Sequence, residues 1–372
     1  MKKSRVLFIL HRSPPNHGAA RVGDLISTSR KLCASFDCKF IKIQASEKIA
    51  DIGTVSSKKL YLTARLFARI IFLLATFRPE KIYFTASIKS VAFYRDVLLS
   101  IIWKLYGLLK PVNVYYHYHT KGVDNFVSSS TLHLTLTRFF VKKVNLILLS
   151  PLLIKDFDKT KVYQDIFVLP NGVKDPIGDD VFINTLISKY YNPSPIQILY
   201  LSYMAKEKGY DEVLNLARHS KGQNIQYQFA GNWQSKEDEK FFYQFVEEYG
   251  LEKSVKYHGY VDKREKAILF TKSHLLAYPS RNDAFPLTII EALSYGVPVI
   301  ATSQGSIPFI LDENSGTIVD RISDFQGQFE KSKLSFINKK SANHCRNRFL
   351  REFSLEKFEN NLIRILNEQA KV

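Results

Sequence analysis

The sequence predicts an α/β protein with two doubly wound parallel sheets, and three observations support this fold class. Short apolar, β-branched runs alternate with longer amphipathic stretches along the 372 residues. The runs form two sets of six, separated by a polar stretch over residues 171–195. Many runs are apolar on both faces, which is typical of parallel strands covered by helices on each side. Such sheets bind ligands at the carboxyl ends of their strands, so we expect the best site in a cleft between two facing sheets.

Each set contains six expected strands, with helices between most of them. The first set covers residues 6–10, 40–43, 81–85, 114–119, 146–150 and 167–170, and the second covers residues 196–201, 227–231, 255–259, 274–279, 297–302 and 317–319. Helical patterns cover residues 60–77, 90–109, 212–218, 237–249, 286–295 and 353–367. We therefore expect one domain over residues 1–175, a second over residues 176–352, and a C-terminal segment, 353–372, whose helix packs back on the first domain.

Charge is distributed unevenly between the two halves. The chain has 53 Lys and Arg against 35 Asp and Glu, but residues 1–150 alone have 24 basic and 7 acidic side chains, a net charge of +17, whereas residues 201–372 have +2. An excess of this kind indicates an anionic partner of the first domain, whether nucleic acid, lipid head groups or a phosphorylated ligand. The basic residues are dispersed and match no nucleic-acid-binding motif, which argues against nucleic acid.

Targeting and redox features are few. Three cysteines are too few for a disulfide framework, and a reducing cytoplasm is the expected setting. Charged residues interrupt the two most apolar segments, so neither reaches the roughly 20 apolar residues of a membrane span. In residues 60–77, however, Arg65 and Arg69 lie at i, i+4 spacing among large apolar residues. This layout suits a helix resting on an anionic lipid surface, although its apolar face would equally suit packing on the sheet.

Residues 278–302 carry the most informative pattern. A buried strand is expected to end at Pro279, and Pro286 suits the first position of a helix, where its missing N–H costs nothing. The free N–H groups of that helix favour an anion. Asp283 lies before the helix and Glu291 within it. A carboxylate repels a bound anion, so these two side chains are expected to accept hydrogen bonds from neutral hydroxyls of the ligand. A ligand with a diphosphate and sugar hydroxyls satisfies both demands.

This stretch resembles the signature of glycosyltransferase family 4, in which two acidic residues stand eight positions apart. The resemblance extends over most of the chain, through 14–19, His119-Thr120, 169–173, Lys208-Gly209, Ala230-Gly231 and 258–261. It implies the GT-B architecture, with two Rossmann-like domains facing a central cleft. It also implies a retaining, metal-independent, hexosyltransferase-like enzyme that takes a nucleotide sugar as co-substrate and needs no cofactor.

The resemblance assigns roles to individual residues of the donor site. Glu291 would bind the ribose hydroxyls, Asp283 would contact the donor sugar, and Lys208 would hold the diphosphate as a point charge. The backbone from Ala284 through Phe285 and Pro286 to Leu287 would approach the same diphosphate. No metal ligand is implied.

Two further residues, both in the first domain, also receive roles from the resemblance. Gly18 would let the first loop come close to the donor. His119 would lie near the transferred sugar and the acceptor, although a satisfied core histidine is an alternative, because His117 and His119 share one strand face.

The chain departs from the family pattern at several positions. Asp283 replaces the usual Glu, Tyr203 stands where an Arg is normal, and Phe309 replaces a frequent Glu; Lys206 is a substitute for the missing Arg charge. Because of these departures, a catalytically weak membrane scaffold is one alternative function. A nucleotide-sugar epimerase or a phosphorylase on the same fold is another.

The expected function is sugar transfer to a lipid-linked or cell-surface polysaccharide precursor of a bacterial envelope. The donor half is almost neutral, so the +17 charge of residues 1–150 belongs to the acceptor side. We therefore expect a cytoplasmic protein, peripheral on the inner face of the cell membrane, with a glycan or lipid-linked acceptor, an anionic membrane surface as partner and no nucleic acid.

Overall fold

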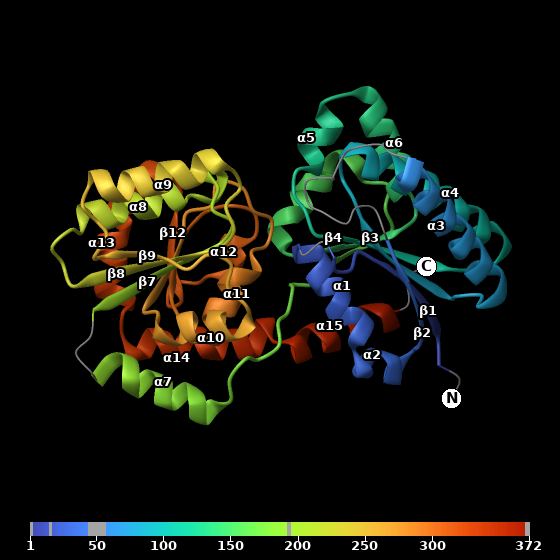
Figure 1. The fold of residues 1–372 in the computed structure, drawn as a ribbon. Helices are drawn as coiled ribbons and strands as arrows, with labels where there is room; N and C mark the ends of the chain where they lie inside the picture. Colours follow the sequence, from blue (N-terminus) through green and yellow to red (C-terminus); the bar gives the residue numbers. More distant parts are fainter. Residues whose placement is uncertain (1–2, 15–16, 44–56, 192–194, 369–372) are drawn as a thin grey trace. The chain divides into compact units, whose positions relative to one another are not determined.

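The computed structural model describes residues 3–14, 17–43, 57–191 and 195–368. The chain forms two compact units, one of Met1–Asn171 with Phe358–Val372 and one of Gly172–Lys357. Each unit contains a six-stranded sheet in which every strand pairs in parallel with its neighbours (Figure 1). The predicted pair of doubly wound parallel sheets is thus confirmed.

The first sheet has the strand order β2-β1-β3-β4-β5-β6. Its strands are β1 (Arg5–Leu10), β2 (Asp37–Lys42), β3 (Lys81–Ala86), β4 (Asn113–Tyr118), β5 (Asn145–Leu148) and β6 (Ile166–Val168). The accompanying helices are α1 (Gly18–Thr28), α2 (Arg30–Ser35), α3 (Ser57–Thr76), α4 (Ser90–Leu109), α5 (Val123–Ser128), α6 (Thr131–Val141) and the 3₁₀ segment η2 (Pro151–Thr160).

The direction of the strand order decides which face each helix covers. The chain moves toward one edge of the sheet from β1 to β2, and toward the opposite edge from β2 through β3 to β6. Because parallel crossovers are right-handed, the connecting helices of the two directions lie on opposite faces. Accordingly, α1 and α2 lie on one side of the sheet, and α3, α4 and α6 on the other (Figure 1). Among the described residues, no helix combines the length and the apolarity that crossing a membrane requires.

The second sheet has the order β12-β11-β10-β7-β8-β9. Its strands are β7 (Ile196–Leu201), β8 (Ile225–Ala230), β9 (Val255–Tyr257), β10 (Leu275–Tyr278), β11 (Val299–Thr302) and β12 (Gly316–Val319). The helical segments are α7 (Asp179–Tyr191), η3 (Lys206–Lys208), α8 (Tyr210–His219), α9 (Lys236–Glu248), α10 (Lys263–Lys272), α11 (Leu287–Ser294), α12 (Ile307–Ile310), η4 (Ile322–Asp324), α13 (Phe325–Phe336), α14 (Lys339–Arg348) and η5 (Phe349–Phe353).

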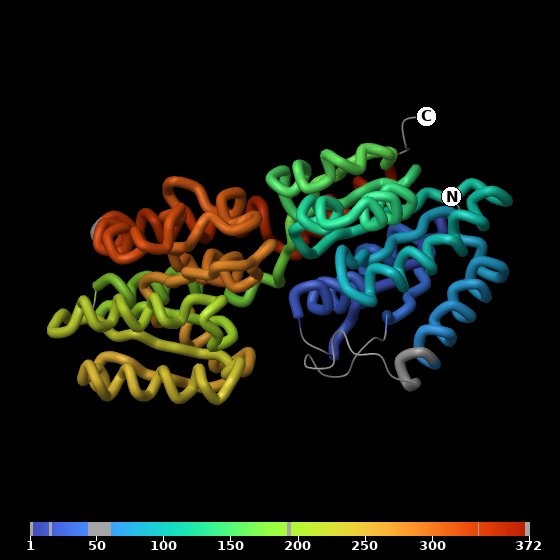
Figure 2. Tube along the Cα trace, turned by 90° about the horizontal axis from the view of Figure 1, so that it is seen from above, coloured from blue at the N-terminus to red at the C-terminus, as the bar shows by residue number. Residues whose placement is uncertain are grey.

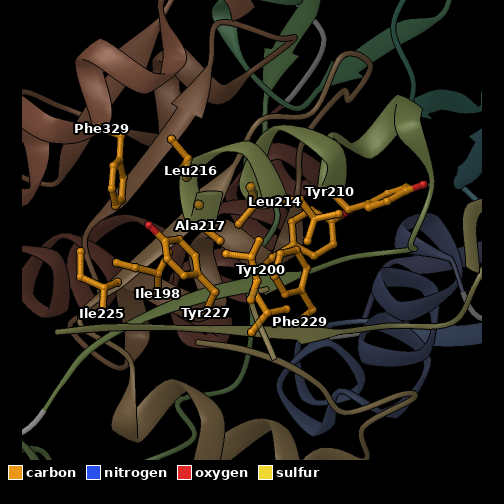
Figure 3. Close-up of a cluster of buried hydrophobic side chains, with 14 of the residues drawn as sticks. Ile198, Tyr200, Tyr210, Leu214, Leu216, Ala217, Ile225, Tyr227, Phe229 and Phe329 are labelled. Atoms are coloured by element: carbon orange, nitrogen blue, oxygen red, sulfur yellow. The ribbon is translucent and has the colours of Figure 1, made fainter. Parts of the chain in front are cut away.

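A core of aromatic and aliphatic side chains anchors α8 to this sheet (Figure 3). Tyr200 and Phe229 project from adjacent strands, and Leu214 packs on them from α8. The Tyr227 hydroxyl lies 2.7 Å from Ser220 Oγ, so this buried phenol keeps a hydrogen-bond partner. The core thereby holds the segment just before α8 at the carboxyl edge of the sheet.

The order in which strands are added to the second sheet reverses between β7 and β10. From β7 the chain adds β8 and β9 on one side, and it then adds β10, β11 and β12 on the other side of β7. The loops after β7 and β10 diverge there, and open α/β sheets bind ligands at this reversal.

The last helix, α15 (Leu355–Asn367), begins in the second unit, and from Phe358 onward it belongs to the first. Figure 2 follows this return of the chain to the N-terminal elements. Two backbone hydrogen bonds, Val173 N to Phe353 O and Leu355 N to Val173 O, tie the two crossing segments together.

Candidate functional site

The loops after β7 and β10 meet at the reversal of the second sheet. Gly209 follows η3 with φ +79°, a left-handed conformation that favours glycine. A Cβ on Gly209 would also collide with the carbonyl of Pro279 at the end of β10. The adjacent Lys208 is therefore held against the β10 loop by backbone geometry.

Lys208 and Asp283 form the centre of this site. Lys208 Nζ donates to Asp283 Oδ2 at 2.9 Å and to the Asn282 carbonyl at 2.7 Å. The same Oδ2 accepts from Ser280 Oγ at 2.6 Å and from the Tyr278 hydroxyl at 3.0 Å. The Lys208 and Asp283 side chains keep 23% and 17% of their surface exposed, so a ligand can reach both.

A second cation in the loop is already neutralised. Arg281 makes a bidentate contact with Asp211, at 3.0 and 3.1 Å, and donates to Glu212 at 2.7 Å. Its backbone N–H also donates to Glu207 O. These contacts fasten the β10 loop to the start of α8 and leave less of the Arg281 charge for a ligand than Lys208 retains.

The loop after β11 fastens the other side of the β10 loop. Gly305 has φ +54°, and a Cβ there would collide with the carbonyls of Asp283 and Ala284. Ser306 N donates to Ala284 O at 2.8 Å, and Thr302 Oγ1 donates to Ser280 O. The site is therefore held by three neighbouring strands, which limits its movement.

Helix α11 begins at Leu287, one residue later than predicted, and Pro286 is its N-cap instead of its first residue. The difference arises because Pro286 has ψ 113°, an extended value outside the helical range. No side chain caps this N-terminus. Phe285 and Leu287 are buried, so their backbone is better placed than their side chains to contact a ligand.

Glu291 is paired with a residue that the sequence did not point to. Its Oε1 accepts from Lys266 Nζ of α10 at 2.5 Å, and both side chains are about four-fifths buried. The two residues are 25 positions apart and share no motif. The pairing fixes the orientation of Glu291 before any ligand binds.

His119 and Gly18 both belong to the first unit. The rings of His117 and His119 lie 4.0 Å apart at the end of β4. Burial, with a contribution from His17, lowers the pKa of His119 to about 3, so its imidazole is neutral at pH 7. His119 Nδ1 has no hydrogen-bond partner among the described residues, whereas His117 Nδ1 contacts the Tyr83 hydroxyl.

Gly18 opens α1 directly after His17, whose Nδ1 caps the helix by accepting from Ala20 N at 3.3 Å. A Cβ on Gly18 would meet nothing within 4 Å, so packing within the protein does not require glycine here. Pro15 and Asn16 of the predicted loop lie outside the described residues.

Sequence reasoning also missed His11, which follows β1 and whose ring lies 5.8 Å from that of His17. Its pKa is lowered to about 3, chiefly by burial and then by Arg95. Within the described ranges, no group of three or more His, Cys, Asp or Glu side chains is arranged to hold a metal ion.

In a comparison with known proteins, one family model matches most of the second unit. The family model described as "Glycosyl transferases group 1" matches residues 187–348. An uncharacterized 41.2 kDa protein in the cps region of Klebsiella pneumoniae is 32% identical over 127 residues, which are 34% of this chain and 33% of the relative. The O-antigen chain mannosyltransferase B of Escherichia coli is 31% identical over 83 residues, 22% of each chain. The chain thus spans a third or less of the length of these relatives.

Similarity to solved structures extends over both units. The structure of Anabaena Alr3699/HepE in complex with UDP-glucose aligns with a TM-score of 0.66 and 14% identity, covering 97% of this chain and 99% of that one. At this identity the likeness establishes the fold only. With the family match, it confirms the predicted family resemblance and the two-domain GT-B fold.

Proposed function

Residues 187–348 belong to the group 1 family of glycosyl transferases, and we propose that the chain moves a sugar from a nucleotide diphosphate sugar to an acceptor hydroxyl. One observation carries the proposal: Lys208 and Asp283 meet at the strand reversal of the second sheet, beside the uncapped N-terminus of α11. The UDP-glucose complex of the Anabaena structure supports a donor of this class.

The donor is held by charge and by backbone dipoles. Lys208 is the cation for the diphosphate, and the free N–H groups at the start of α11, after Ala284 to Leu287, add their dipoles. Asp283 fixes Lys208 through their 2.9 Å ion pair and presents its carboxylate to the sugar. Glu291, oriented by Lys266, accepts hydrogen bonds from the ribose hydroxyls.

The chemical step follows from where negative charge develops. The leaving diphosphate gains charge in the transition state, and Lys208 with the α11 N-terminus stabilises it without a metal ion. The acceptor hydroxyl attacks the anomeric carbon on the face that the diphosphate leaves, so the configuration at this carbon is retained. The proton of the acceptor hydroxyl passes to the leaving phosphate. His119, neutral at pH 7, positions sugar or acceptor hydroxyls by hydrogen bonding. Gly18 leaves room for the donor.

The acceptor is a polysaccharide precursor carried on a lipid phosphate. Two observations support this choice. The two curated relatives are described by a cps region and by O-antigen chains, and residues 1–150 have a net charge of +17. Such an acceptor would place the protein on the cytoplasmic face of a membrane, with Arg65 and Arg69 of α3, both exposed, at the lipid head groups.

A panel of nucleotide sugars tests the enzyme proposal. We expect one donor to raise the thermal midpoint and to be hydrolysed slowly without acceptor. Lys208→Ala and Glu291→Ala should each weaken donor binding by about tenfold to a hundredfold, because each removes hydrogen bonds to a charged group. Lys272→Ala, at an exposed lysine of α10, is the matched control. The absence of any donor response, or full donor affinity in both variants, would refute the proposal.

A further inference from the structure

Helix α4 exposes an apolar stripe along its outward face. Its inward face is buried through Phe93, Val97, Leu99 and Trp103. Yet large side chains recur outward at helical spacing and are exposed: Val91, Tyr94, Leu98, Ile101, Leu105, Leu108 and Leu109. A helix that is hydrophobic all round is ordinarily covered on every side. Leu108 and Leu109 are 82% and 83% exposed, so this stripe requires a cover from outside the described structure.

The neighbouring helices extend the stripe into a surface. Helices α3 and α6 lie on the same side of the first sheet as α4 (Figure 1). They expose Tyr61, Ile71 and Phe72 from α3, and Leu132 and Phe139 from α6. We call the α4 stripe together with these five residues the apolar surface.

Charge indicates what covers the apolar surface. Across α3, α4 and α6 the sequence contains one acidic residue, Asp96. It is fully buried and paired with Arg95 at 2.7 Å. The exposed charges on and next to these helices are mostly cationic: Arg65, Arg69, Arg78, Lys110, Arg138, Lys142 and Lys143. The exposed Glu80, beyond the end of α3, lies 3.6 Å from Arg5.

We infer that the apolar surface docks on an anionic lipid bilayer, with α4 lying along the interface and the surrounding cations at the phosphates. A second copy of the chain is the weaker occupant, because it would bring two cationic surfaces together. This inference deepens the proposed membrane contact. The sequence assigned the contact to residues 60–77, but Leu66, Ile70 and Leu74 of α3 are buried in the first unit. Seven of the twelve residues of the apolar surface lie on α4.

Vesicle binding by the full chain tests the inference without donor or acceptor. Phosphatidylcholine vesicles containing roughly 30% phosphatidylglycerol supply the anionic surface, and pure phosphatidylcholine vesicles are the reference. The triple variant Leu105→Ser, Leu108→Ser, Leu109→Ser should lower partitioning about tenfold or more, because burial of these side chains contributes to binding. The matched control removes three half-exposed apolar residues of α7, with Val181→Ser, Ile183→Ser and Ile187→Ser, and should bind like the wild type.

Two further measurements keep the outcomes separate. The single variant Leu109→Ser should show a smaller loss in the same direction and guards against misfolding of the triple variant. Light scattering should find equal masses for the wild-type and triple-variant chains; a dimer lost in the triple variant would overturn the inference in favour of a second copy. Unchanged vesicle partitioning in the triple variant would also overturn it. Donor affinity is measured separately, so failure of the enzyme proposal leaves this result intact.

Discussion

Removing the Asp283 carboxylate tests the central contact of the candidate site. In Asp283→Ala, three donors lose their shared acceptor: Lys208 Nζ, Ser280 Oγ and the Tyr278 hydroxyl. Lys208 and Ser280 retain a second acceptor in the Asn282 carbonyl, at 2.7 and 3.3 Å. Tyr278 is buried, and its hydroxyl keeps the Ser202 side chain as its remaining hydrogen-bond partner.

The expected loss of stability follows from these contacts. A buried donor without a partner costs about 1–3 kcal/mol, and a hydrogen bond to a charged group contributes about 1.5–3 kcal/mol. Because each of the three donors keeps a second partner, the loss stays below the full sum of three such bonds, and we expect Asp283→Ala to lower the free energy of unfolding of the second unit by about 2–4 kcal/mol. With a urea dependence of roughly 2 kcal/mol/M, the midpoint falls by about 1–2 M.

The two tryptophans make the assay specific to one unit. Trp103 lies in the first unit and Trp233 in the second, so Trp233 fluorescence in a Trp103→Phe background follows the second unit alone. Asp324→Ala is the control, since Asp324 pairs at 3.1 Å with Arg321, which is 80% exposed, and its loss should cost within about 0.5 kcal/mol. A midpoint for Asp283→Ala equal to that of the control would show that the three donors do not converge on this carboxylate.

Two further predictions concern backbone geometry and acid. Gly209→Ala should destabilise the second unit by about 1–3 kcal/mol and weaken donor binding with it. Gly222→Ala, also at positive φ (+85°) but in open space, isolates the conformational cost, so equal losses in urea melts would contradict the predicted collision with Pro279. The second prediction is that the first unit loses stability as the pH falls below about 6.5. Burial lowers the pKa of His11 and His119 to about 3 in the folded protein, so below pH 6.5 the unfolded chain binds more protons than the folded one. Trp103 fluorescence melts between pH 7 and 5 measure this slope, His119→Gln should reduce it, and a first unit equally stable at both pH values would contradict the assignment.

The sequence predicted the parts of the site that lie within one contiguous stretch. Asp283, the start of α11 and Glu291 occupy nine consecutive positions, so strand, loop and helix signals define them together. Lys208 came from the family resemblance. Lys266 and the contact of Arg281 with Asp211 and Glu212 were missed, because partners 25 to 70 positions apart share no local pattern.

The same distinction applies to the first unit. Its basic charge is a property of composition and was evident without coordinates. The exposed stripe of α4 was not, because a helix that is apolar all round does not indicate which side packs on the sheet. The left-handed positions of Gly209 and Gly305 were likewise invisible, since glycine is also frequent in ordinary loops.

The sequence alone therefore determined the two parallel sheets, the charge difference between the halves and the acidic pair around α11. Each of these features depends on hydrophobic periodicity, charge or residue spacing within contiguous stretches of the chain. The tertiary structure decided which side chains meet. It brought Lys208 to Asp283 and Lys266 to Glu291, and it left Leu108 and Leu109 exposed on α4. These outcomes depend on strand order and on which helix face packs against the sheet, and both are set only when distant segments pack together.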